Sequence, residues 1–312
     1  MTVKTVDSKA NLTANADRGP SRVIWGDCPV LALIEEPQKG MYFFDDFLMA
    51  GNAVMSSIYK NSLGAWTTYA AAGSLLDDDA KEGGCLTLTS GTDLDQTVMF
   101  SSVGAFRFVT TSTLALNQKM WFEARVAKSA IATDILEGFV GLADHQLTSS
   151  IPAVNSLFSG TDDTLATAPS FFGFYNKGDT AQTEWQLVFN LAGGTVNFPT
   201  GLTTLMNTAT GAVLTANQYV KLGFVFDPAA AVGQVTSATA RQTNGQLVKK
   251  LLRVFVNGIE LPTFLSSADI ANATATQAFP TGFLSPIFGC QQHATKGLFK
   301  IDWIRVAQVG NS

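Results

Sequence analysis

The sequence predicts an all-β protein, an antiparallel sandwich of two sheets over residues 41–312 that follows an extended arm over residues 1–40. Two dense runs of β-forming residues carry this prediction, Leu252–Phe264 and the terminal Phe299–Val309. The chain between the arm and these runs alternates short strand-like segments with turn residues, and no stretch shows a sustained 3.6-residue hydrophobic period. With 312 residues, 46% of them hydrophobic, the chain is long enough to enclose one large core.

The segment Leu252–Phe264, LRVFVNGIELPTF, is typical of a β-hairpin. Asn257-Gly258 tolerates positive φ at both central positions of a type I′ turn, so the residues on either side should pair as antiparallel strands. Ile259–Leu261 is the expected return strand. Because Pro262 has no N–H to donate to a neighbouring strand, we expect the pairing to end there.

The remaining strands are predicted from runs of alternating or aromatic-rich residues bounded by turns. In chain order they are Met41–Leu48, Trp66–Tyr69, Leu86–Thr89, Thr97–Phe100, Ala105–Val109, Met120–Ala127, Glu137–Asp144, Ser170–Tyr175, Trp185–Asn190 and Tyr219–Phe226.

Strict alternation assigns the two faces of the central strands, because successive side chains of a strand point to opposite sides of the sheet. In Met120–Ala127, one face carries Phe122, Ala124 and Val126, and the other carries Trp121, Glu123 and Arg125. In Tyr219–Phe226, one face carries Val220, Leu222, Phe224 and Phe226. We expect Phe224, Phe255 and Trp303 to belong to the sandwich core.

Residues 1–40 differ from the rest of the chain. Five basic residues balance five acidic ones, and no hydrophobic period is present. We therefore expect an extended arm in which Val30–Ile34 adds a strand to its own sheet or to the sheet of a neighbouring molecule. A disordered tail with a short edge strand is the alternative.

The order of the strand motifs resembles that of the concanavalin A-like lectin/glucanase group of jelly-roll sandwiches, including its laminin-G-like members. The motifs span residues 41–309 and run from the entry strand FFDDF through WFEAR, FVGLAD, GFY and LGFVF to the VNG hairpin and the closing IDWIRV. This resemblance implies a jelly-roll topology. Within the group, the low charge and the start of the chain are similar to those of structural proteins of tailed-bacteriophage virions, such as head-decoration proteins and tail-associated adhesins.

Glycosidases of this group carry E-x-D-x-E or E-x-D-x-x-E on one strand, which directs a nucleophile and an acid into one groove. The nearest sequence here contains Asp134 and Glu137, with Ala132 at the position of the first Glu. The resemblance therefore implies that the chain is not an enzyme, and no catalytic residue is predicted. Glu123 and Glu137 could converge from neighbouring strands, but we expect them to be solvated acids on strand faces.

Other kinds of catalytic site have little support in the sequence. Neither His145 nor His293 lies near a G-x-S-x-G turn, and no phosphate-binding glycine motif is present. Cys28, Cys85 and Cys290 are widely spaced, which favours buried free thiols in a protein made in a reducing cytoplasm.

Calcium is the one cofactor to weigh, because lectins of this group hold Ca²⁺ through loop carboxylates. Asp77–Asp79 and Asp162-Asp163 are the available acidic clusters, and we interpret them as solvated loops, with no cofactor. Aromatic side chains that could form a carbohydrate platform are Trp66, Tyr69, Trp121 and Trp185, although aromatics in sandwiches are more often core residues.

The charge pattern excludes some partners. A net charge of −5 and scattered basic residues argue against nucleic acid. The sequence contains no apolar run of 18 residues, so no membrane span is predicted. Residues 1–20 lack the apolar region of a signal peptide.

Three classes of function remain. The small charged fraction, 14% against about 25% in an average protein, and the arm favour a non-enzymatic bacteriophage virion structural protein. We predict a capsid decoration protein that binds the major capsid protein as an oligomer, with a trimer suggested by analogy. A carbohydrate-binding adhesin of a phage tail or capsid surface is the alternative, and a glycan hydrolase or lyase is the second alternative.

Overall fold

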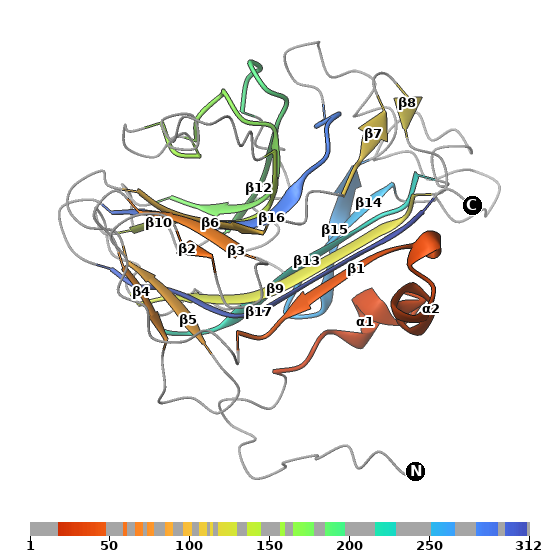
Figure 1. Cartoon of the computed structure of the whole chain (residues 1–312), viewed down its shortest axis with the longest axis horizontal. Helices are drawn as coiled ribbons and strands as arrows, with labels where there is room; N and C mark the ends of the chain where they lie inside the picture. The colour runs from red at the N-terminus through yellow and green to blue at the C-terminus, as the bar shows by residue number, and fades with distance from the viewer. Residues whose placement is uncertain are drawn as a thin grey trace, which may run out of the picture.

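The computed structural model shows two antiparallel sheets packed face to face, with two short helices on the outer side of one sheet (Figure 1). This confirms the predicted all-β sandwich of jelly-roll type. The residues that the structure describes are 18–47, 59–60, 66–70, 74–77, 85–89, 96–101, 106–110, 113–114, 118–129, 136–144, 157–159, 165–177, 185–196, 216–228, 251–265, 279–292 and 297–310.

One sheet, here named the β9 sheet, is built around the longest strands of the chain. Its order is β15 (Ile259–Leu265), β14 (Leu252–Val256), β13 (Val220–Phe226), β9 (Met120–Lys128), β17 (Phe299–Val309), β5 (Leu86–Thr89) and β4 (Ser74–Asp77). The long strand β17 pairs with β5 through Phe299–Ile301 and with β1 (Gly40–Asp45) through Ile304–Val309. Since β17 also pairs with β9, it joins β5 and β1 to the centre of the sheet.

The second sheet, here named the β10 sheet, lies opposite. Its order is β12 (Gln186–Asn190), β11 (Phe171–Asn176), β10 (Leu136–Ala143), β16 (Ser285–Gln292), β6 (Gln96–Ser101), β3 (Trp66–Ala70) and β2 (Tyr59–Lys60). A separate two-stranded ribbon consists of β7 (Val109–Thr110) and β8 (Thr113–Leu114).

The core between the sheets is rich in phenylalanine, and the alternation of β9 and β13 places its members there as predicted. Phe122 and Phe224 are cross-strand partners that stack with ring centroids 4.9 Å apart. Phe172 of the β10 sheet meets Phe224 edge-on at 4.8 Å. Each of these three side chains is fully buried. Aromatic pairs at such distances add to the free energy gained from burial alone.

The Asn-Gly hairpin forms as predicted, but its return strand is longer than expected. Asn257 and Gly258 have φ of 51° and 75°, the positive values that a type I′ turn requires. Pro262 does not end the pairing. Strand β15 continues to Leu265, and its register with β14 shifts between Arg253 and Phe255. Since β15 is an edge strand of the described sheet, a proline without an N–H is tolerated there.

Two of the three predicted core residues lie on the outer face of the β9 sheet. Phe224 belongs to the core between the sheets, whereas Phe255 is packed in a separate cluster beneath the N-terminal helices. Trp303 is 3% exposed, and its indole nitrogen bonds to the N-terminal segment. The prediction of burial is confirmed, but the predicted placement of Phe255 and Trp303 between the sheets is wrong. The N-terminal segment that covers them on the outer face was expected to extend away from the sheet.

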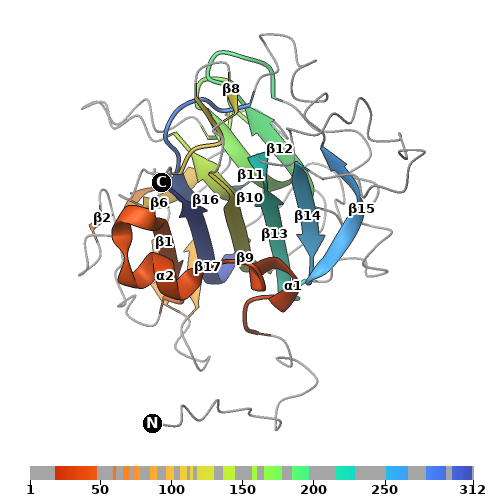
Figure 2. The same cartoon turned by 90° about the vertical axis from the view of Figure 1, so that its right-hand side faces the viewer.

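The N-terminal part described by the structure contains helical turns. These are α1 (Arg22–Trp25), α2 (Val30–Glu35) and the 3-10 helix η2 (Pro37–Lys39). They lie against β9, β13, β17 and β1 on the outer face of the β9 sheet (Figure 2). The boundary at residue 40 stays a prediction, but the described part of the arm, residues 18–39, is docked on the sheet.

The predicted strand at Val30–Ile34 is wrong, because this apolar run forms α2. The backbone N–H of Leu33 donates to Pro29 O at 3.0 Å, and that of Glu36 donates to Ala32 O at 2.9 Å. Only Leu33 of this helix is buried. A short apolar run without periodicity does not distinguish a strand from a helix. Here the conformation of the run is set by its packing on the face of the sheet.

Among the described residues, no helix is long and apolar enough to cross a bilayer.

Candidate functional site

The outer face of the β9 sheet carries a group of charged side chains that is buried. Glu123 and Arg125 come from β9, Lys221 from β13 and Asp302 from β17, and none of the four is more than 7% exposed. Alternation along each strand directs them away from the core. They are buried because residues 18–36, here named the strap, cover this face.

The first anchor of the strap is an ion-pair triad. Asp302 lies at the β-bulge between Ile301 and Trp303, and its carboxylate pairs with both Arg18 of the strap and Arg125 of β9. The Nε of Arg18 is 3.0 Å from each carboxylate oxygen. Arg125 also lies over the ring of Tyr219, 4.3 Å from its centroid. A buried carboxylate shared by two cations avoids the cost of an unpaired charge.

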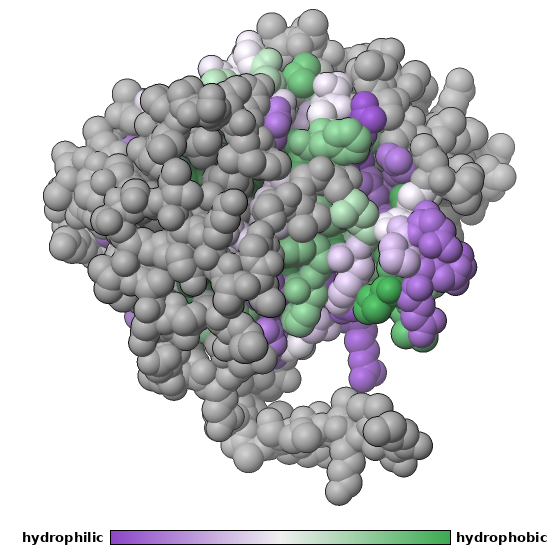
Figure 3. Space-filling view, viewed as in Figure 1, coloured by the Kyte–Doolittle hydropathy of each residue, from purple (hydrophilic) through white to green (hydrophobic). Residues whose placement is uncertain are grey.

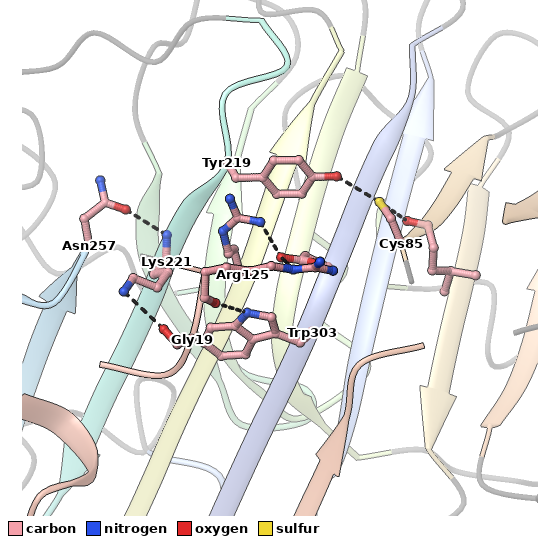
Figure 4. A network of polar contacts seen from close by, with 10 residues as sticks. Gly19, Cys85, Arg125, Tyr219, Lys221, Asn257 and Trp303 are labelled. Carbon is pink, nitrogen blue, oxygen red and sulfur yellow. Dashed lines mark hydrogen bonds and ion pairs between the residues drawn. The ribbon is translucent and has the colours of Figure 1, made fainter. Parts of the chain in front are cut away.

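The sheet also binds the backbone of the strap (Figure 4). The indole nitrogen of Trp303 donates to Arg18 O at 2.6 Å, and Lys221 Nζ donates to Gly19 O at 3.3 Å. Lys221 itself is held in place at its backbone N–H, which donates to Asn257 Oδ1 at 2.9 Å. These contacts hold residues 18–21 on the sheet without strand pairing.

The centre of the face is Glu123, which holds the start of α1. Its Oε2 accepts a 2.9 Å hydrogen bond from the backbone N–H of Ser21 and a 2.8 Å bond from Trp25 Nε1. Burial raises the pKa of this carboxyl, although the hydrogen bonds from the strap and the charge of Lys221 oppose the increase. The other oxygen of this carboxyl, Oε1, is buried and has no hydrogen-bond partner.

Aromatic and aliphatic contacts complete the docking. The guanidinium of Arg305, the cross-strand neighbour of Glu123, lies 4.2 Å from the ring centroid of Trp25. Gly223 leaves room for α1, because a Cβ there would lie 2.5 Å from Ile24 Cδ1. Ile24 and Trp25 are both buried, and burial of a large apolar side chain contributes about 1.5–3 kcal/mol.

A second charged group lies at the far end of α1. Lys119 Nζ pairs with Asp27 at 2.5 Å and with Asp227 at 3.4 Å. Trp121 Nε1 donates to Asp27 at 2.8 Å. Partial burial opposes ionisation of Asp27, but the hydrogen bonds from Lys119 and Trp121 hold its pKa below the ordinary value. The strap is thus fixed to the sheet by ion pairs at its first residue and again just after α1.

The three cysteines are free, as predicted, but they differ in burial. Cys85 and Cys290 are buried, whereas Cys28 is half-buried, and burial raises its pKa to about 12. Cys85 Sγ lies 2.8 Å from the hydroxyl of Tyr219, whose pKa is raised by burial and by this contact. A thiol whose pKa is raised in this way is a poor nucleophile, so Cys28 is not a reactive site.

The two acids predicted to be solvated are fully buried, and that prediction is wrong. Glu123 lies beneath the strap. Glu137 points outward from β10, accepts a 2.5 Å hydrogen bond from Tyr175 Oη and lies beside a buried apolar cluster that includes Leu157 and Phe158. They lie on different sheets, so the structure does not bring them together in one groove. Alternation predicts the face of a strand but not what covers it.

The candidate aromatic platform is not exposed where the structure describes it. Trp66, Trp121 and Trp185 are buried, and Trp66 Nε1 donates to Asp45 at 2.6 Å. The side chain of Tyr69 lies outside the described residues. So do both candidate histidines and the side chains of the two acidic clusters: His145, His293, Asp77, Asp78, Asp79, Asp162 and Asp163. Within the described part of the chain, no three metal-ligating side chains come together.

Sequence reasoning missed an exposed apolar patch formed by the strap helices and β1. Its members are Val23 (58% exposed), Leu31 (68%), Ile34 (55%) and Phe44 (44%). Figure 3 shows hydrophobic residues beside hydrophilic ones where α1 and α2 lie in Figure 1. The apolar run VLALIE was the available signal, but as a helix it buries Leu33 and leaves Leu31 and Ile34 in solvent.

No family model and no curated protein matches this chain. Solved structures with a similar fold include the endo-1,3-beta-glucanase from Streptomyces sioyaensis, at 12% identity and a TM-score of 0.46, over 86% of this chain and 96% of that one. Peanut lectin matches at 12% identity and 0.45, over 88% and 99%. A carbohydrate esterase from the Shiga toxin-encoding bacteriophage phi24B matches at 15% and 0.40, over 83% and 100%. Similarity at this level carries no information on ligand or activity.

Proposed function

We propose that this protein is a non-enzymatic structural protein of a bacteriophage virion, a capsid decoration protein that binds the head lattice as an oligomer. The observation that carries the proposal is the exposed apolar patch of Val23, Leu31, Ile34 and Phe44. Large apolar side chains that stay exposed on neighbouring elements are a feature of protein–protein contact surfaces. The virion setting itself rests on the small charged fraction of the chain, in which it is similar to structural proteins of tailed-bacteriophage virions.

The strap supports a role in assembly because its contacts with the β9 sheet hold it in one position. Ion pairs hold it at Arg18 and at Asp27, and Glu123 holds the segment between them. Helices of four and six residues are too short to be stable alone, so the sheet keeps the patch in place. An interface presented by a preorganised segment loses less conformational entropy on binding.

The burial of the two candidate acids supports a non-enzymatic role. A glycosidase needs two carboxyl groups about 5–9 Å apart on either side of a substrate bond. Glu123 and Glu137 lie on different sheets, each fully buried, and each is engaged by a donor, Trp25 and Tyr175 respectively. Neither offers a free carboxylate to a polysaccharide.

The partner we propose is the major capsid protein, with further copies of this chain in the same oligomer. Only 14% of the residues are charged, which is few for a free sandwich of this size. A trimer follows by analogy with three-fold lattice sites. Binding of glycans at the capsid or tail surface is the alternative role.

The test is binding to phage heads that lack the protein, measured by cosedimentation. The full-length double variant Leu31→Asp/Ile34→Asp should bind at least tenfold more weakly, a loss of about 1.4 kcal/mol or more. Phe283→Asp is the matched control, since Phe283 is 58% exposed and lies outside the patch.

Full binding by the patch variant would contradict the proposal. So would a strictly monomeric wild-type protein that binds glycans tightly in an array, which would favour the adhesin. Light scattering on the same samples gives the oligomeric state.

A further inference from the structure

We propose that the strap opens from the β9 sheet as one unit, and that ionisation of Glu123 favours the open state. The closed state is the docked arrangement described above, and its hold on the strap weakens as the pH rises. This inference concerns a conformational equilibrium within one chain, so it does not depend on which partner the protein binds. The same equilibrium decides whether residues 18–36 are held in fixed positions.

The strap is a separate unit because side chains, and not strand pairing, join it to the sheet. In the described structure it belongs to neither sheet, and its helical turns are held by local bonds such as that from Trp25 N to Ser21 O at 3.1 Å. Just after the strap the chain is fixed again, because Gly310 N donates to Lys39 O at 2.6 Å. Helices of four and six residues are not stable alone. Residues 18–36 are therefore released together when the side-chain contacts break.

The seam between the strap and the sheet contains polar atoms that are poorly satisfied. Ser21 Oγ, Glu123 Oε1 and Arg305 Nε are buried, and none of these three atoms has a hydrogen-bond partner in the protein. Glu123 and Arg305 are cross-strand neighbours on the outer face, and Ser21 N–H binds the other oxygen of the Glu123 carboxyl. A buried polar atom without a partner costs free energy that hydration returns. Opening hydrates all three atoms, so they lower the free energy of opening.

Glu123 is the acid whose ionisation the closed strap opposes. It is fully buried beneath α1, and burial raises its pKa. The charged groups that face it are Lys221 from β13, whose Nζ donates to the strap backbone at 3.3 Å, and Arg305 from β17, whose guanidinium lies 4.2 Å from the ring centroid of Trp25. The donors Ser21 and Trp25 and the charge of Lys221 lower the pKa, but burial is the larger effect.

The sign of the pH dependence follows from where the Glu123 carboxyl meets water. Opening returns it to solvent on a face that carries Lys221 and Arg305, so its pKa falls on opening. The closed state therefore binds this proton more tightly than the open state. Its advantage is fully present below about pH 4.5 and is lost as the pH rises through the pKa of the closed state. A single proton changes the ratio of closed to open molecules by at most about tenfold per pH unit.

The other charged groups described at the strap act outside this range. The pKa of Asp27 lies below its ordinary value of 3.8 in the closed state, so its contribution to closure is complete above about pH 3.8. The pKa of Cys28 is raised from 9.0 to about 12, so its contribution is lost only above about pH 9. Arg22 of α1 is exposed, and Asp302 lies between two guanidinium groups that keep their charge. Between pH 4.5 and 8, opening of the strap therefore reports Glu123.

The test is hydrogen–deuterium exchange of the full-length protein between pH 4.5 and 8, measured by mass spectrometry on peptides from residues 18–36. Glu123→Gln is the matched variant, because it keeps an acceptor oxygen and is neutral at every pH. Intrinsic exchange rates of the strap are the same in both proteins, so the ratio of the two rates at each pH measures opening. Strap protection in the wild type should fall relative to the variant, by up to about tenfold per pH unit, and then level off.

Two comparisons within the same data show whether the strap opens as a unit. Peptides that contain the bonded N–H groups of Trp25 in α1 and Leu33 in α2 should lose protection together. Peptides from β11 in the opposite sheet should be at least tenfold better protected, because they exchange through global unfolding. A response confined to α1, or equal protection of the strap and β11, would overturn opening as a unit. Strap peptides without protection at any pH would contradict the closed state itself.

A second pair of variants tests the role of Glu123 without changing this residue. Trp25→Phe removes a donor that favours the ionised carboxyl, so the fall in protection should move to higher pH. Trp303→Phe is the matched control, because it removes an indole donor to the strap backbone at Arg18 O, and should leave the position of the fall unchanged. A flat wild-type profile, an equal slope in Glu123→Gln or equal shifts in the two tryptophan variants would overturn the proposal.

Discussion

Glu123 on β9 and Trp25 on α1 are 98 residues apart in the sequence, and a 2.8 Å hydrogen bond from the indole Nε1 to the carboxylate Oε2 joins them. The same oxygen accepts the backbone N–H of Ser21. One buried carboxyl therefore connects the strap to the centre of a sheet. Its partners and its protonation state bear on how firmly the strap is held.

The pH dependence of stability should carry the signature of Glu123. Burial raises its pKa above the ordinary value of 4.5, so the folded protein binds this proton more tightly than the unfolded chain does. The stabilisation from protonation is fully present below about pH 4.5 and is lost as the pH rises through the folded pKa. Glu123→Gln is neutral at every pH and should remove this slope. Urea unfolding between pH 4.5 and 8, followed by tryptophan fluorescence, measures it.

Two further variants complete this test. Glu35→Gln removes an acid from the exposed side of α2 and serves as the matched charge control. Glu123→Ala leaves the donors of Ser21 and Trp25 without an acceptor and should cost about 1–3 kcal/mol. Wild type and Glu123→Gln with parallel pH profiles would refute the assignment.

The Asp302 triad should show a graded response. Asp302→Asn leaves Arg125 buried without its counter-charge and should lower the free energy of unfolding by about 3–5 kcal/mol. Arg18→Gln should cost only about 1 kcal/mol, because the Arg18 side chain is 29% exposed and water can solvate the remaining groups. Equal losses in chemical denaturation would show that the two cations do not differ in burial as described.

The hairpin allows backbone strain to be separated from a side-chain contact. Asn257→Ala places an alanine at φ of 51° and also removes the oxygen that binds the N–H of Lys221. We expect a loss of about 1–2 kcal/mol from the backbone alone and about 1 kcal/mol more from the lost bond. Asn257→Gly relieves the strain and loses only the bond, so it should be the milder change in a urea titration. The reverse order would argue against a type I′ turn.

The aromatic core should be sensitive at Phe224, which stacks on Phe122 and meets Phe172 edge-on. Phe224→Ala creates a cavity and should cost about 3–5 kcal/mol in unfolding experiments. Phe283→Ala is the matched control on the surface, with a change of at most about 0.5 kcal/mol expected. An unchanged melting temperature for Phe224→Ala would mean that β13 presents its other face to the core.

We expect no hydrolysis of β-glucans by the purified protein. Ala132 replaces the first acid of the glycosidase pattern, and Glu137 is fully buried with Tyr175 donating to it. The assay is release of reducing ends from a panel of β-glucans. Turnover that disappears in Glu137→Gln would overturn this prediction.

Several features followed from local sequence because their causes are local. Asn257-Gly258 specifies its turn through φ alone, and alternation in Met120–Lys128 and Val220–Phe226 assigns inner and outer faces through the two-residue period of a strand. The missing glycosidase acid at Ala132 is likewise visible without any structure. These local signals predicted the sandwich and the core position of Phe224.

Only the tertiary structure decided what covers each face. Val30–Glu35 is a helix because the β9 sheet receives Leu33, and a six-residue apolar run has no period of its own to exclude a strand. Glu123 and Glu137 alternate as solvated acids would, yet segments distant in the sequence bury them. Trp303 and Phe255 are buried on the outer face for the same reason. The sequence by itself determined which side of a strand a residue takes, whereas long-range packing determined whether that side meets solvent or a buried partner.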